Sequence, residues 1–218
     1  MGTDNIRQII AAARQHEQTT AALQEHFNHQ LPLLGAQLWL PATGAARALV
    51  RFVEQYIEYV PEFIESVSQL SKERGLEQSV APFLHMAEDF FLAPPRSLEE
   101  SPGLIGLLDE AFLAQRLIEE VNDRHIRFRR MPLLPVDMTR ANIIVHHLIG
   151  DARANRLNEL VEQSAKLLVE HQHLFENFHA HDDETSVLDL WQGLPCLSRS
   201  ASIDLRLPTV SFDQSTPS

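Results

Sequence analysis

The sequence predicts an all-α fold, a bundle of five to six helices of which three are long, followed by an irregular, partly extended C-terminal arm. Apolar residues recur at alternating steps of three and four over long stretches, which is the pattern of a packed helix face. Glycine and proline residues separate these stretches. The hydrophobic share of 44% in 218 residues is enough to form a sizeable core. We therefore expect one helical-bundle domain over residues 1–181 and an arm or flexible tail over residues 182–218.

The first half of the chain predicts three helices. The first spans residues 3–30, with Thr3 or Asp4 as its N-terminal cap, and a connector over residues 31–41 follows it. The second, over residues 43–74, has the widest apolar face and should be the most buried. The third is short, over residues 78–92. We expect the four glutamates opposite the apolar face of the second helix to form a solvated acidic surface: Glu54, Glu58, Glu62 and Glu65.

The second half predicts a long helix over residues 103–128, a short one over 140–149 and a final long one over 151–179. We expect a break at Gly150, because a continuous helix would turn Arg153 onto the apolar side. From residue 182 the chain is rich in Ser, Thr and Pro. Ile203, Leu205 and Leu207 alternate with polar residues, a pattern that permits an extended arm.

Three histidines stand where the helix patterns call for apolar residues. His16, His125 and His171 occupy these positions on three different helices. Buried neutral imidazoles ligate metals and haem, and such sites are built in the cores of helical bundles. Glu119 and Glu170 lie close enough in sequence to join a candidate metal site. The alternative interpretation is that each histidine fills space in the core and hydrogen-bonds a polar neighbour.

Helix direction decides between these interpretations. His125 lies about 22 residues into its helix and His171 about 20 residues into the last one. If the two helices run parallel, both imidazoles lie at similar heights. If they run antiparallel, roughly 30 Å separates the imidazoles at a rise of 1.5 Å per residue. The sequence leaves both arrangements open.

Charge and composition disfavour several classes of protein. The formal net charge is −12, which would repel nucleic-acid phosphates and anionic lipid, so we expect neither nucleic-acid nor membrane partners. No apolar run reaches the roughly 18 residues of a transmembrane helix. The single cysteine, Cys196, excludes an intramolecular disulfide. We expect a cytoplasmic protein.

No complete catalytic constellation is present. The sequence lacks a glycine-rich phosphate loop and a nucleophile elbow. The leading hypothesis is therefore a non-catalytic interaction or regulatory protein that binds a protein partner or forms a homo-oligomer. A second hypothesis is an oxidoreductase that uses iron or haem at His125 and His171, with His16 as a further ligand. A third is a binder of a small apolar ligand between helices, with histidines as its polar contacts.

Overall fold

A computed structural model describes residues 3–73, 75, 77–93, 103–130, 134, 136–171 and 203–206, without the side chains of residues 79, 128, 129 and 169–171. Seven helices form within these residues, so the all-α prediction is confirmed. They are α1 (Thr3–Thr20), α2 (Ala22–Gln37), α3 (Ala45–Glu73), α4 (Glu77–Leu92), α5 (Leu104–Arg129), α6 (Thr139–Ile149) and α7 (Asp151–His171). Two short strands, β1 (Leu38–Trp39) and β2 (Asp204–Leu205), complete the described part.

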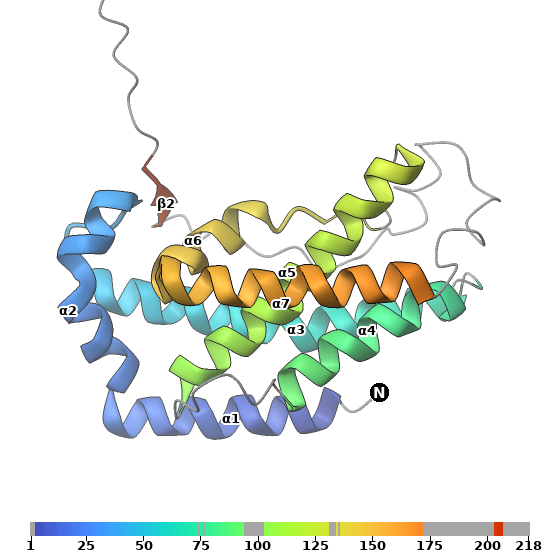
Figure 1. Cartoon of the computed structure of the whole chain (residues 1–218). Helices are drawn as coiled ribbons and strands as arrows, with labels where there is room; N and C mark the ends of the chain where they lie inside the picture. Colours follow the sequence, from blue (N-terminus) through green and yellow to red (C-terminus); the bar gives the residue numbers. More distant parts are fainter. Residues whose placement is uncertain are drawn as a thin grey trace, which may run out of the picture.

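α3 and α5 form the centre of the bundle. α3 packs against α1, α2, α4 and α5, and α5 also contacts α1, α4, α6 and α7. α5 crosses diagonally between α7 on one side and α3 on the other (Figure 1). Tyr56, Phe63 and Phe112, three of the largest side chains on these two helices, are almost entirely buried. None of the described helices combines the length and apolar character needed to cross a membrane.

The predicted first helix, over residues 3–30, is wrong in one respect, because the chain breaks at Ala21. Ala21 adopts a left-handed conformation, with φ of 52° and ψ of 28°. The Glu17 carboxylate accepts hydrogen bonds from the backbone N–H groups of Leu23 (2.8 Å) and Gln24 (3.0 Å), so it caps the new helix. The expected connector over residues 31–41 is largely helical instead, since α2 continues through Pro32 to Gln37.

The glutamate row of α3 is not simply solvated. α1 lies against α3, and its arginines pair with three members of the row. Arg7 binds Glu65 at 2.6 Å, and Arg14 lies 3.6 Å from Glu54 and also pairs with Glu58. The hydrogen bond from Arg7 holds the pKa of Glu65 below its usual range. The acidic row therefore helps to fix α1 on the bundle.

Four residues of the predicted arm are described, and they are extended. β2 pairs antiparallel with β1, with Leu38 opposite Leu205 and Trp39 opposite Asp204. Ile203 is buried, and Arg140 of α6 donates to its carbonyl oxygen at 2.8 Å. This segment is thereby attached to the end of the bundle formed by α2 and α6 (Figure 1). The predicted boundary at residue 182 lies outside the described residues.

Candidate functional site

A pocket of about 400 Å³ opens between α5, α6 and α7. Each of these helices contributes hydrogen-bonding side chains to its wall, and α5 and α6 add apolar ones. Phe112 and Ile143 form apolar parts of the wall. The polar residues are Arg116 and Glu119 from α5, Thr139, Asn142, His146 and His147 from α6, and Asn158 from α7.

Glu119 is the centre of the polar network at this pocket. One carboxylate oxygen, Oε1, accepts a hydrogen bond of 2.8 Å from the Thr139 hydroxyl. The other, Oε2, accepts from the Asn142 amide at 2.5 Å and from the Arg116 guanidinium. The Glu119 side chain is 14% exposed. A carboxylate so enclosed needs charged and polar partners, and these three residues supply them.

The network continues into the core through Asn142. The hydroxyl of Tyr56 on α3 donates to Oδ1 of Asn142 at 2.6 Å. Burial raises the pKa of Tyr56 well above its usual value, so the phenol stays neutral and acts as the donor. The Gln115 amide donates to the backbone carbonyl of Tyr56 at 2.6 Å. Polar groups from α3, α5 and α6 therefore fix one another behind the pocket.

α5 and α7 run in the same direction beside the pocket. Arg153 near the start of α7 pairs with Asp109 near the start of α5, with Nη2 2.5 Å from Oδ2. Further along both helices, Nε of Arg116 donates to Oδ1 of Asn158 at 3.1 Å. Residues later in α5 therefore contact residues later in α7, so the two helices run parallel. This is the arrangement expected if α6 is a separate helix.

Two adjacent histidines of α6, His146 and His147, line the pocket. Nε2 of His146 lies 3.2 Å from a carboxylate oxygen of Asp151. Burial and the neighbouring His146 lower the pKa of His147, and Asp151 opposes this effect. His147 is therefore neutral near pH 7. Its buried Nδ1 atom has no hydrogen-bond partner among the described residues.

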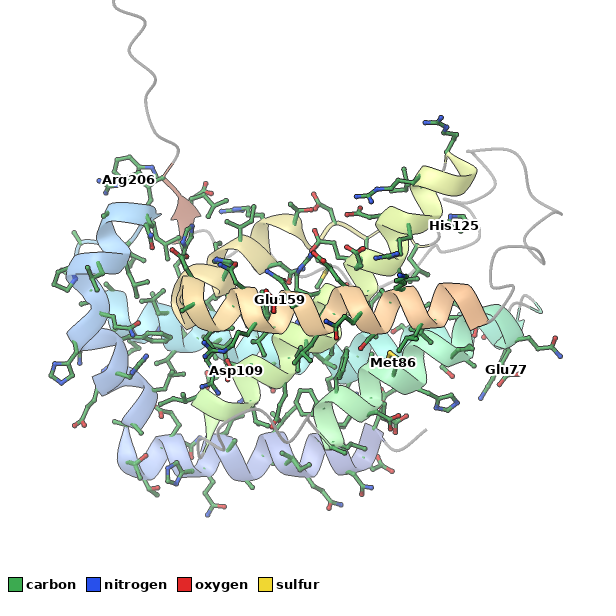
Figure 2. All side chains as sticks on the ribbon, in the orientation of Figure 1. Glu77, Met86, Asp109, His125, Glu159 and Arg206 are labelled. Atoms are coloured by element: carbon green, nitrogen blue, oxygen red, sulfur yellow. The ribbon has the colours of Figure 1, made fainter. Side chains whose placement is uncertain are left out.

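The structure does not bring the predicted metal-site residues together where their side chains are described. His125 is buried near the C-terminal end of α5 (Figure 2). His16 lies against Gly103, because a Cβ at Gly103 would be 2.8 Å from Cδ2 of its imidazole. Gly103 precedes the opposite end of α5. At a rise of 1.5 Å per residue, the helix from Gly103 to His125 spans about 33 Å. The imidazoles of His16 and His125 therefore cannot bind the same metal ion.

Of the other predicted metal ligands, one lies at the pocket and two have side chains that the structure does not describe. Glu119 belongs to the pocket network, where Arg116, Thr139 and Asn142 bind its carboxylate. The helical backbone of α7 includes Glu170 and His171, but their side chains lie outside the described part of the structure. Within the described residues, no three His, Cys, Asp or Glu side chains are grouped as a metal site would require.

Most residues of the pocket carry no signal in the sequence that marks them as a site. Asn142 stands between Ala141 and Ile143 on a helix that is otherwise largely apolar, and this was the one local signal. His146 and His147 follow on the same short helix. The sequence places Glu119 in a candidate metal site with His125, whereas the structure places its carboxylate against α6. The pairing of α5 with α6 gives these residues their shared position.

Comparison with models of known families, with curated proteins and with solved structures finds no significant match to this chain.

Proposed function

We propose that this protein binds a small organic ligand in the pocket between α5, α6 and α7. The observation that carries the proposal is the convergence of seven polar side chains on a pocket of about 400 Å³ with Phe112 and Ile143 in its wall. Small-molecule sites typically combine apolar walls with a few fixed polar groups in volumes of about 300–1,000 Å³. This hypothesis corresponds to the third alternative from the sequence, with a more polar site than was expected.

The polar groups support recognition because they are held in place before a ligand arrives. Glu119 is fixed by three donors, and Arg116 is fixed by Glu119 and Asn158. Preorganised groups lose little conformational entropy on binding. The proposal therefore assigns the pocket a binding function and assigns no residue a catalytic one.

The proposal is tested with three compounds of similar size, namely benzylamine, benzyl alcohol and benzoate. We expect at least one of them to bind with a Kd of about 1 mM or tighter, as is usual for ligands of this size. Backbone amide NMR shifts during titration should change at the lining residues of α6 and at Asn158. If none of the three compounds perturbs these signals, the proposal is wrong.

A matched pair of variants locates the binding. Ile143→Trp places a large ring at the mouth of the pocket, on a residue that is 41% exposed. Ile9→Trp makes the same change on α1, at a residue that is 39% exposed and lies outside the pocket. Binding should be lost in Ile143→Trp and retained in Ile9→Trp. Retention in both variants would place the ligand elsewhere.

Association with a protein partner or a second copy is the second candidate function. Leu33 on α2 is 74% exposed and Trp39 on β1 is 58% exposed, and these are the two most exposed large apolar side chains in the described part of the chain. Contiguous exposed apolar patches mark association sites, and these two side chains would anchor such a patch where α2 meets β1. Sedimentation velocity should therefore show self-association that Leu33→Ser weakens. A monomer at every concentration would exclude association with a second copy of the chain.

The proposed location is the cytoplasm. It rests on the single cysteine, which is compatible with a reducing compartment.

A further inference from the structure

Residues 203–206 contact the helical bundle in the way that a bound, extended peptide contacts a protein. β2 pairs antiparallel with β1, and the backbone N–H of Arg206 extends the pairing by donating to the Gln37 carbonyl at 2.8 Å. In the described part of the chain, β1 pairs with no other strand. The bundle therefore presents a short strand edge that an extended segment completes, which is a common mode of peptide recognition.

Three side chains of the segment make separate contacts with this surface. Ile203 is 1% exposed and belongs to the hydrophobic core. Leu205, opposite Leu38, packs against the same core. Arg206 lies over the Trp39 ring, with its Cζ 4.1 Å from the ring centroid, which is a favourable cation–π arrangement (Figure 2). Backbone pairing accepts many sequences, whereas these contacts select apolar residues at the first and third positions and a basic residue at the fourth.

Arg140 of α6 selects the second position. Its Nε donates to Oδ1 of Asp204 at 3.0 Å, and its Nη2 donates to the Ile203 carbonyl oxygen at 2.8 Å. One guanidinium group therefore binds both a side chain and the backbone of the segment. The bond to Asp204 joins two opposite charges, so an acidic residue is favoured at this position over a neutral or a basic one.

The segment is far in sequence from the residues that bind it. α7 ends at His171, and residues 172–202 lie between it and the segment. Arg140 precedes Ile203 by 63 positions, and β1 lies still earlier in the chain. Contacts of this kind do not depend on the covalent connection, which only raises the effective concentration of the segment at the surface. The same surface can therefore bind the same pattern of residues on another molecule.

We infer that the surface formed by β1, the C-terminal end of α2 and Arg140 recognises an extended peptide of the pattern apolar–acidic–apolar–basic, and that residues 203–206 occupy it as an internal ligand. A partner protein that carries this pattern in an extended segment binds by displacing residues 203–206. The internal ligand competes with the partner through its effective concentration. The inference is independent of the proposed small-molecule pocket, because none of these contacts involves a residue of that pocket.

The test titrates a capped peptide of residues 201–208 into the full chain and follows the backbone amide NMR shifts of β1. Ile203→Asp vacates the surface, because it places a carboxylate at a buried apolar position. We expect a Kd of about 1 mM or tighter for the Ile203→Asp chain, and binding at least about tenfold weaker for the original chain, in which the internal ligand competes. The peptide that itself carries Ile203→Asp is the control and should bind neither chain.

Absence of binding to the Ile203→Asp chain would overturn the inference, and so would equal binding of the control peptide. Asp204→Arg provides a second way to vacate the surface. It changes an exposed residue and breaks the ion pair with Arg140, so it places no charge in the core and gives the same comparison if Ile203→Asp fails to fold.

A charge exchange locates the peptide at Arg140. Arg140→Glu, introduced into the Ile203→Asp chain, should weaken binding of the peptide at least about fivefold, because it replaces an attraction by a repulsion. The peptide carrying Asp204→Arg should regain affinity for this double variant. Arg156→Glu makes the same change of charge on the exposed side of α7 and should leave the affinity within about twofold. Equal weakening by Arg140→Glu and Arg156→Glu would contradict binding at this surface.

Discussion

Asn142 and Glu119 connect α6 to α5 through a hydrogen bond of 2.5 Å between the amide nitrogen and a carboxylate oxygen. The same amide group accepts the Tyr56 hydroxyl through its oxygen at 2.6 Å. One side chain therefore satisfies a carboxylate at the pocket and a fully buried phenol on α3. This makes Asn142 a structural requirement of both the pocket and the core behind it.

Asn142→Ala should lower the free energy of unfolding by about 2–4 kcal/mol. The substitution leaves the Tyr56 hydroxyl buried without its acceptor and removes one donor from Glu119, and unmet buried polar groups are costly. Urea unfolding measures the change. Tyr56→Phe should cost less, about 1–2 kcal/mol, because it leaves the bond to Glu119 in place. The double variant should be less destabilised than the sum of the two changes, and strict additivity would show that the network is not coupled.

Arg153 makes a further measurable contribution, because it neutralises Asp109. The Asp109 carboxylate is 7% exposed, and burial raises its pKa even though Arg153 acts in the opposite direction. Arg153→Met should destabilise the protein by about 2–3 kcal/mol at neutral pH, since it leaves a buried charge without its ionic partner. Arg156→Met, on the exposed side of α7, is the control and should change stability by less than about 0.5 kcal/mol. Similar losses from both variants would mean that the Asp109 pair is energetically unimportant.

The sequence predicted the helices where their packing depends on local periodicity. α3 was expected over residues 43–74 and spans Ala45–Glu73, and the break at Gly150 separates α6 from α7 as expected. The break at Ala21 was missed, because alanine usually favours helix and no glycine or proline stands there. The local reason for the break is the Glu17 carboxylate, which caps α2 after the chain has turned.

The candidate site was less predictable, because it depends on which helices meet. Spacing along one helix placed His125 and Glu119 in the same candidate set, although six residues separate them and Glu119 faces α6. Two of the three partners of Glu119, Thr139 and Asn142, lie 20 and 23 residues further along the chain. Periodicity identifies a buried face but carries no information on the helix that covers it. The sequence pattern therefore could not predict that α5 pairs with α6.

The Glu17 cap gives a prediction about the chain turn itself. Glu17→Ala should lower the free energy of unfolding by about 1–2 kcal/mol, because the backbone N–H groups of Leu23 and Gln24 lose their acceptors. Gln18→Ala is the matched control, since Gln18 is the next residue of α1 and is exposed. Thermal or urea unfolding should separate the two variants clearly. A loss no greater than that of Gln18→Ala would assign the turn to the packing of α1 and α2 alone.

Glu110 gives the protein a defined dependence of stability on pH. Burial, and then the neighbouring Asp109, raises the pKa of Glu110 to about 7, above the ordinary value near 4.5. The folded state therefore holds this proton more tightly than the unfolded state does. The stabilisation is fully present below about pH 4.5 and is lost as the pH rises toward 7. Because Glu110 is partly exposed, we expect a loss of about 1–2 kcal/mol over this range.

Glu110→Gln removes this titration and should raise the stability at about pH 8 by the same amount, with little change at about pH 5. Glu159→Gln, on the exposed side of α7, is the control and should leave the pH dependence as it is in the original chain. Urea unfolding at several pH values between these limits measures the slope for each protein. The contribution of Asp109, whose pKa is raised in the same direction, remains in Glu110→Gln, so a smaller fall in stability with pH should persist in that variant. An unchanged slope in Glu110→Gln would show that Glu110 is already ionised in the folded protein below pH 7.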